Sequence, residues 1–131
     1  KESRKEAARR FQEDRRDTAT PENMVSLMEK VYRGGGLFPE TRTMLFGILE
    51  RCPTGKNRIP GLLLPDTVVA HKTGTIAGTA SDIGLITLPD QAGHVALAVY
   101  IKGSEKEGAE KERTIAQISR SIYDFFLFRR P

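Results

Sequence analysis

Apolar residues recur at helical spacing between residues 21 and 53, and this pattern predicts two helices there. Thr20 and Pro21 mark the N-terminus of the first of these helices, because threonine is a common N-cap and proline suits the first helical position. The buried stripe of this helix is expected at Met24, Leu27, Met28 and Val31. Pro39 begins the second helix, after three glycines that end the first. The buried face of the second helix is expected at Met44, Leu45, Ile48, Leu49 and Cys52. A shorter run of helix-forming residues, 2–13, precedes both.

After a loop over residues 54–66, the pattern changes to short runs rich in β-branched and small residues. These runs predict three strands, at about residues 67–75, 82–88 and 94–102. The connections between the strands are short, so neighbouring strands are expected to be antiparallel.

A long amphipathic helix is predicted over residues 105–127, with Ser104 and Glu107 matching a capping box at its start. The apolar face of this helix is expected at Ile115, Ile118, Ile122, Phe125 and Phe126. The fold class is therefore α+β, with helices followed by an antiparallel sheet and a covering helix. One helix covers one face of the sheet, so the other face is expected to need a partner. We therefore expect residues 1–131 to need a second polypeptide segment to fold fully.

Composition narrows the class of protein. The chain has 131 residues, of which 38% are hydrophobic and 29% charged, as in one globular domain. The net charge is +4, but basic residues alternate with acids and no aromatic residues interleave with a basic cluster, so nucleic-acid binding is not expected. No apolar run reaches the length of a membrane span. The charged start carries no signal peptide, and we expect it to be an internal position of a larger protein.

Cysteine and histidine offer no metal site. Cys52 has no second cysteine to pair with and is expected to fill the core. The two histidines, His71 and His94, give no zinc spacing. We expect His71 to be a packed strand residue and His94 to lie on the surface.

The most informative stretch is residues 68–75, which read Val-Val-Ala-His-Lys-Thr-Gly-Thr. Residues two apart on a strand share a face, so Thr73 and Thr75 would point one way and Lys72 the other. Gly74 would let a ligand or a neighbouring backbone approach closely. A positive charge beside two hydroxyls suits an anion such as a carboxylate. The alternative is an ordinary strand end with a solvated lysine.

Three ordered motifs give this stretch a context. Arg-Asp-Thr-x-Thr-Pro occurs at residues 16–21, Thr-Gly-x-x-Arg-Ile at 54–59 and His-Lys-Thr-Gly-Thr at 71–75. In this order they resemble the C-terminal half of a class A serine β-lactamase, in the superfamily of β-lactamases and penicillin-binding proteins. The resemblance covers roughly residues 12–127. It implies one segment of a catalytic domain, with an Ω-loop region at 1–20 and a sheet that belongs to a larger five-stranded one.

The resemblance also implies roles for individual residues. Lys72 would be catalytic, and the backbone N–H of Thr75 would be one oxyanion donor. Thr73, Gly74, Thr75 and Arg58 would bind the substrate, with Arg58 reaching its carboxylate through a bidentate fork. The alternative for Arg58 is a solvated loop arginine.

Other parts of the family site are not in this sequence. No serine has a lysine three positions on, and residues 81–83 read Ser-Asp-Ile where the family has Ser-Asp-Asn. Asp17 matches the aspartate that closes the Ω loop, a structural role. The deacylating glutamate would fall near Arg4, between Glu2 and Glu6. Either the loop has a different length, or the glutamate lies outside this sequence, or the protein lacks it and deacylates poorly.

The resemblance implies β-lactam hydrolysis through a serine acyl-enzyme, with no metal or organic cofactor. The implied partners are a β-lactam or peptidoglycan-like small molecule and an N-terminal half of the same enzyme that carries the serine. This chain alone is expected to be inactive. The family setting would be periplasmic or secreted. The alternatives are a D,D-peptidase or esterase on the same fold, and a penicillin-binding or sensor module that does not hydrolyse its ligand.

Overall fold

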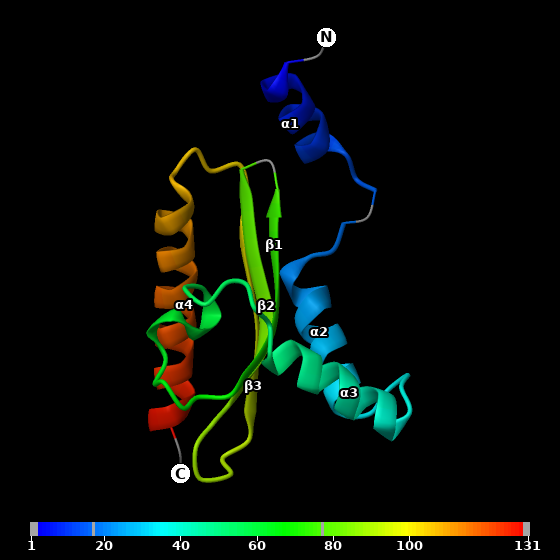
Figure 1. Ribbon diagram of the computed structural model, residues 1–131, viewed down its shortest axis with the longest axis vertical. Helices are drawn as coiled ribbons and strands as arrows, with labels where there is room; N and C mark the ends of the chain where they lie inside the picture. The colour runs from blue at the N-terminus through cyan, green and yellow to red at the C-terminus, as the bar shows by residue number, and fades with distance from the viewer. Residues whose placement is uncertain (1–2, 17, 77, 130–131) are drawn as a thin grey trace.

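The computed structural model describes residues 3–16, 18–76 and 78–129 (Figure 1). Its elements are, in chain order, α1 Arg4–Glu13, α2 Pro21–Tyr32, α3 Pro39–Glu50, the 3-10 helix η1 Ile59–Leu62, β1 Val69–Ile76, β2 Thr79–Thr87, β3 His94–Ile101 and α4 Gly108–Phe128. Helix α4 lies along one face of the sheet, and α2 and α3 lie on the other (Figure 1). The predicted α+β class is confirmed. None of the helices described here is long and apolar enough to cross a membrane.

The sheet is antiparallel, with the strand order β1-β2-β3. Strand β2 begins at Thr79, three residues before the predicted start at 82, because residues 79–81 already pair with residues 74–76. The backbone around Gly74 and Thr75 is therefore held by a neighbouring strand instead of lying next to a turn.

Apolar side chains pack on both faces of the sheet. The cluster toward α4 includes four almost fully buried residues: Ile59, Ile86, Ile115 and Tyr123. The cluster on the opposite face contains Met28, Ala70 and Leu85, with Phe46 and Leu49 packed against it. Burial of each large apolar side chain stabilises the fold by about 1.5–3 kcal/mol. The second face is thus partly covered by α2 and α3, whereas the sequence predicted a sheet covered on one side only.

Helix α3 buries only part of the stripe expected. Met44 and Ile48 lie four residues apart on one side of the helix and are 68% and 56% exposed. Leu49 packs toward the sheet as expected, together with Phe46, which was not part of the expected stripe. This helix has apolar residues on both sides, so the apolar pattern alone does not identify the packed one. Cys52, expected at the end of the buried stripe, lies beyond the helix and is only half-buried.

Helix α4 is present, but its buried stripe is rotated from the prediction. Ile115 is buried as expected, and the stripe continues through Ala116, Ser119 and Tyr123. The predicted members Ile118, Phe125 and Phe126 are 39%, 50% and 47% exposed. Small residues on the inner side let η1 approach, since a Cβ at Gly61 would lie 3.2 Å from that of Ala116.

The predicted capping box of the last helix is wrong. Helix α4 begins at Gly108, with Glu107 as an N-cap that makes no side-chain hydrogen bond. The hydroxyl of Ser104 instead accepts a hydrogen bond from the backbone N–H of Lys106, 3.2 Å away. Ser104 and Glu107 have the capping-box spacing, but residues 104–107 all precede the first residue of the helix, Gly108.

Candidate functional site

Strand β1 is an outer strand of the sheet, and its register decides which backbone groups reach the open edge. The N–H of Thr87 donates to the carbonyl of Val68 at 3.0 Å, so these partners form a hydrogen-bonded pair. Such pairs alternate with non-hydrogen-bonded pairs along an antiparallel ladder. By this alternation, the backbone N–H and C=O groups of Gly74 point toward β2. Those of Thr73 and Thr75 point away from β2. The N–H of Thr75 therefore points to the open edge of the sheet.

The side chains of this edge alternate between the two faces, as the strand pattern predicts. Lys72 is exposed and is the cross-strand partner of Ile83, which packs toward α2 and α3. Its Nζ donates to the carbonyl oxygen of Thr73 at 2.6 Å. Thr73 and Thr75 point to the other face, where each meets a hydroxyl or guanidinium of the segment before η1.

Thr73 is held by a threonine that the sequence analysis did not single out. The hydroxyls of Thr54 and Thr73 lie 2.7 Å apart. The thiol of Cys52 lies 3.6 Å from the carbonyl oxygen and 3.5 Å from the hydroxyl of Thr54. Cys52 therefore supports this loop instead of filling the core, as had been expected.

Arg58 lies directly behind Thr75 and is only 6% exposed. Its Nη2 donates to the Thr75 hydroxyl at 2.6 Å, and its Nη1 donates to the carbonyl oxygens of Gly74 and Ser81 at 3.0 and 2.9 Å. Its Nε donates to the carboxylate of Glu112 at 3.2 Å. Arg58 is therefore a fixed part of the edge, and the alternative of a solvated loop arginine is wrong.

Glu112 is a site residue that the sequence analysis missed. It lies in α4, 54 residues after Arg58, and its side chain is 26% exposed. The signal that could have found it is helical spacing: Glu112 precedes Ile115 and Ala116 by three and four residues, so an acid occupies the end of the buried stripe.

Gly74 allows a close approach of the side chain of Ser81 on β2. A Cβ at this position would lie 2.7 Å from the hydroxyl oxygen of Ser81, its cross-strand partner. The absence of a side chain at Gly74 therefore leaves room for the neighbouring strand.

His71 and Asp82 form a buried polar pair next to this edge. His71 is 3% exposed, which confirms it as a packed strand residue, and its Nδ1 lies 3.0 Å from both carboxylate oxygens of Asp82. Asp82 has no exposed surface, and the sequence analysis gave it no role.

The Ω-loop residues are placed only in part. Asp17 and Glu2 lie outside the described residues. Glu6 caps α1, since its carboxylate accepts a hydrogen bond from the N–H of Ser3 at 2.8 Å. This backbone bond, with the Ser3 hydroxyl, lowers the pKa of Glu6, which is fully exposed on α1. A solvated carboxylate with a lowered pKa is a weak proton acceptor, so Glu6 does not have the surroundings of a general base.

One pocket lies beside the site, under α1. Its volume is 630 Å³ and its lining residues are Phe11, Asp14, Arg16, Thr18, Ala19, Thr79, Ser81, Tyr100 and Lys102. Arg16 bonds to Asp14 and lowers the pKa of that carboxyl, whereas burial raises the pKa of Tyr100. At neutral pH the pocket therefore offers an ion pair and a protonated phenol. Ser81 connects it to the site, because it is the partner of Gly74.

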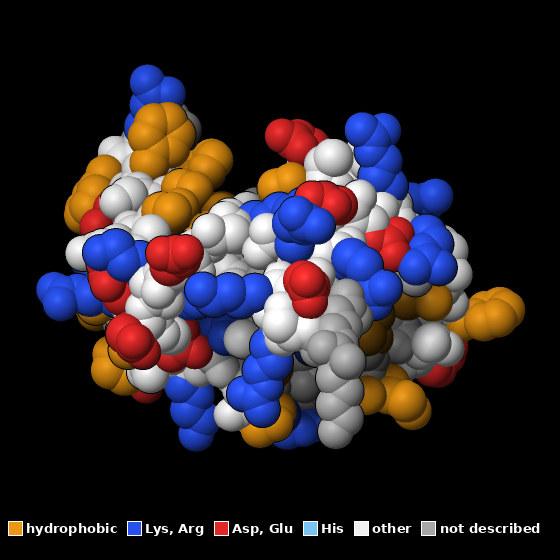
Figure 2. Space-filling view, turned by 90° about the horizontal axis from the view of Figure 1, so that it is seen from above, with side chains coloured by type: hydrophobic (Ala, Val, Ile, Leu, Met, Phe, Trp, Pro, Cys, Tyr) orange, Lys and Arg blue, Asp and Glu red, His pale blue; other side chains and the backbone are white. Residues whose placement is uncertain are grey.

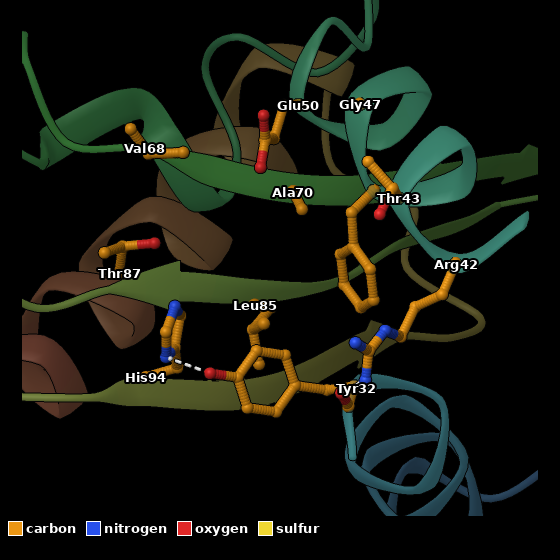
Figure 3. Close-up of a pocket in the computed structure, with 11 residues that line it drawn as sticks. Tyr32, Arg42, Thr43, Gly47, Glu50, Val68, Ala70, Leu85, Thr87 and His94 are labelled. Carbon is orange, nitrogen blue, oxygen red and sulfur yellow. Dashed lines mark hydrogen bonds between the residues drawn. The ribbon is translucent and has the colours of Figure 1, made fainter. Parts of the chain in front are cut away.

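A second pocket, of 520 Å³, lies between the sheet and the helices α2 and α3 (Figure 3). The hydroxyl of Tyr32 bonds to Nδ1 of His94 across it at 2.9 Å. Neither pocket includes Lys72, Thr73 or Thr75, which lie on the open edge of β1. Seen from above, Lys and Arg side chains are interspersed with Asp and Glu, and hydrophobic side chains are exposed at both sides of this face (Figure 2).

Comparison with protein families gives one match over most of the chain. The model of the β-lactamase enzyme family matches residues 2–126. The chain is 31% identical over 117 residues to β-lactamase VEB-1 of Pseudomonas aeruginosa, covering 83% of this chain and 39% of that protein. It is 33% identical over 109 residues to the extended-spectrum β-lactamase PER-1 of the same species, covering 79% and 35%.

Solved structures agree with the sequence relatives. The TLA-1 extended-spectrum β-lactamase superposes with a TM-score of 0.78 at 36% identity, covering 83% of this chain and 42% of that one. A class A β-lactamase from Bacteroides cellulosilyticus superposes with a TM-score of 0.77 at 29% identity, over 83% and 42%. The chain thus spans about two fifths of the relatives that it matches. It belongs to the β-lactamase enzyme family, and its fold is one portion of the class A serine β-lactamase fold.

Proposed function

We propose that this chain supplies the substrate-binding edge of a serine enzyme that hydrolyses β-lactams. The observation that carries the proposal is the register of β1, which directs the N–H of Thr75 outward beside Lys72 and Thr73. A backbone N–H held rigidly in a strand is a preorganised donor for a developing oxyanion. The names of the relatives, all β-lactamases, support the same reaction class.

In this mechanism a serine attacks the β-lactam carbonyl, the ring C–N bond opens to give an acyl-enzyme, and water then hydrolyses the ester. The N–H of Thr75 stabilises the oxyanion in each step, together with the N–H of the attacking serine. The positive charge of Lys72 lowers the electrostatic cost of binding the negatively charged carboxylate of the substrate. Because no serine of this chain has a lysine three positions on, we propose that an N-terminal segment carries the nucleophile.

Exposed apolar side chains support such a segment. Large hydrophobic residues more than a third exposed occur on α2, α3, β1, β3 and α4; examples are Leu27, Met44, Ile76, Tyr100, Phe125 and Phe126. A completing segment would cover some of these side chains, since exposed apolar surface commonly marks an interface. Strand β3 is also an outer strand of the described sheet, as expected for three strands of a five-stranded one. We propose a periplasmic or secreted setting for the completed enzyme.

Arg58 contributes through Thr75 in this proposal. The hydroxyl of Thr75 accepts a hydrogen bond from Nη2, so its own hydrogen is free to turn toward a substrate carboxylate. The described contacts use four of the five N–H donors of the guanidinium. Arg58 thus orients the hydroxyl and adds a fixed positive charge behind it.

Glu112→Gln tests the contribution of the contact between Glu112 and Arg58. The amide keeps an acceptor for Nε of Arg58 but removes the negative charge. A hydrogen bond to a charged partner weakens by about 1 kcal/mol when one charge is lost. We expect KM for a cephalosporin to rise severalfold with little change in kcat, measured by steady-state kinetics. An unchanged KM would show that Arg58 is held without Glu112.

Intact-protein mass spectrometry tests the proposed reaction. The completed enzyme, meaning residues 1–131 joined to an N-terminal segment that carries Ser-x-x-Lys, is mixed with a penicillin. We expect a covalent adduct that disappears as the antibiotic is hydrolysed, and no adduct on residues 1–131 alone. An adduct that persists indicates a penicillin-binding or sensor module. An adduct that persists together with cleavage of a D-Ala-D-Ala peptide indicates a peptidase, and the absence of any adduct contradicts the proposal.

A further inference from the structure

A single buried carboxylate lies behind the substrate-binding edge. Asp82 has no exposed surface, and its Oδ2 accepts a hydrogen bond from the backbone N–H of Ile59 at 3.1 Å. Nδ1 of His71 lies 3.0 Å from both carboxylate oxygens. A carboxylate oxygen accepts hydrogen bonds, so this geometry suits the tautomer of His71 that carries its proton on Nδ1.

These contacts join the two parts of the site. His71 belongs to β1, two residues before Thr73, and Asp82 is the cross-strand partner of Thr73. Ile59 directly follows Arg58 in the chain. One carboxylate therefore connects the strand that presents the threonine hydroxyls to the segment that presents the guanidinium.

The packing around the pair leaves little room for adjustment. A Cβ at Gly84, the cross-strand partner of His71, would lie 2.9 Å from the Cβ of His71 and 3.3 Å from Cδ1 of Ile59. A glycine is thus needed for β2 to lie this close to His71 and to the backbone of β1, because the same Cβ would also lie 2.9 Å from the carbonyl oxygen of Ala70. Displacement of one donor to Asp82 would be passed directly to the other, because close-packed interiors transmit strain.

Stability alone does not account for a carboxylate in this place. Taking charges out of water is costly, and apolar residues of similar volume are often at least as stabilising as a buried ion pair. A buried acceptor with two donors from separate segments does, however, fix the distance between those segments. Misplacement of a binding group by about 1 Å lowers catalytic efficiency by about 10²-fold.

We propose that Asp82 and His71 are positioning residues, which set Arg58 and Thr73 in the geometry that holds the substrate carboxylate. Neither side chain touches the substrate. The inference rests on the proposed function, and it adds to it the element that aligns the two halves of the carboxylate site.

Paired substitutions at His71 separate positioning from a general structural effect. His71→Phe keeps a ring of similar size but removes the donor, whereas His71→Asn keeps an N–H donor close to the place of Nδ1. In the completed enzyme, kcat/KM is measured for a chromogenic cephalosporin and for its methyl ester, which lacks the carboxylate charge. The measured quantity is kcat/KM for the free acid divided by kcat/KM for the ester. We expect His71→Phe and Asp82→Asn to lower this acid-to-ester ratio by about 10- to 100-fold, and His71→Asn to keep most of the parental ratio.

A buried polar residue elsewhere gives the control. Ser119 is fully buried in α4 and bonds to the carbonyl oxygen of Ile115, so Ser119→Ala should keep the parental ratio. A general loss of packing lowers kcat/KM for both substrates alike. An unchanged ratio in His71→Phe therefore overturns the inference and leaves the proposed function intact. A parent inactive on both substrates contradicts the proposed function, and the inference falls with it.

Amide hydrogen exchange gives a readout that is independent of activity. We expect the N–H of Ile59 to exchange slowly in the parent and at least about 10-fold faster in Asp82→Asn, because its acceptor is weakened. If Asp82→Asn does not fold, His71→Phe and His71→Asn still decide the outcome. Rapid exchange of Ile59 in the parent overturns the inference directly.

Discussion

Lys72→Ala lowers the rate of serine acylation in the completed enzyme by about two orders of magnitude, because it removes fixed charge from a preorganised site. The melting temperature stays nearly unchanged. Lys72 is exposed, and the hydrogen bond of its Nζ goes to the carbonyl of the adjacent residue, Thr73. Loss of such a surface side chain alters the free energy of unfolding by only about 0.5 kcal/mol. Stopped-flow absorbance with a chromogenic cephalosporin measures the acylation rate.

A second exposed lysine provides the matched control. Lys106 forms an i,i+4 ion pair with Glu110 at 2.9 Å near the start of α4, away from β1. Lys106→Ala removes the same charge and the same number of atoms, so both variants have the same net charge. We expect parental acylation in this control. Parental acylation in Lys72→Ala as well would mean that β1 is not the substrate-binding edge.

The sequence predicted the alternation of side chains along β1 because strand periodicity is a local property. Residues two apart share a face of a strand whatever packs on it. The separation of Lys72 from Thr73 and Thr75 therefore follows from the pattern alone. The element order and the antiparallel class follow from equally local signals, namely capping residues and short connections.

The partners across the site could not be predicted in the same way. Glu112 meets Arg58 from 54 residues away, and Asp82 meets Ile59 from 23 residues away. Periodicity indicates which side of an element is buried, but not which residue of another element it meets. The same limit explains α3 and α4, whose packed stripes were predicted only in part because apolar residues occur on more than one side of each helix.

Arg58 shows this difference in one residue. The family resemblance implied a place near the strand, and the guanidinium does contact Thr75. Spacing could not show that the side chain is buried and bonded to two carbonyl oxygens of the sheet. The arginine therefore supports the fold as well as the site, and its substitution should affect both.

Arg58→Ala is expected to raise KM for a cephalosporin by about 10- to 150-fold, which corresponds to about 1.5–3 kcal/mol of lost charge-assisted hydrogen bonding. It also removes one donor from the carboxylate of Glu112 and one from each of the carbonyl oxygens of Gly74 and Ser81. Removing one member of a buried ion pair costs about 3–5 kcal/mol of stability. Chemical denaturation should therefore show a clear decrease in the free energy of unfolding. Both effects are measured in the completed enzyme.

Arg58→Lys separates the two roles. A lysine keeps the positive charge near Glu112, but a single ammonium cannot reproduce a planar fork that reaches Glu112, Gly74 and Thr75 together. We expect part of the stability to return while KM stays raised, because the hydroxyl of Thr75 loses the donor that orients it. Arg33→Ala breaks an exposed ion pair with Glu29 and serves as the control. It should leave KM at the parental value and change the free energy of unfolding by no more than about 0.5 kcal/mol. Parental KM in Arg58→Ala would remove Arg58 from the substrate site and leave it a structural residue of the sheet.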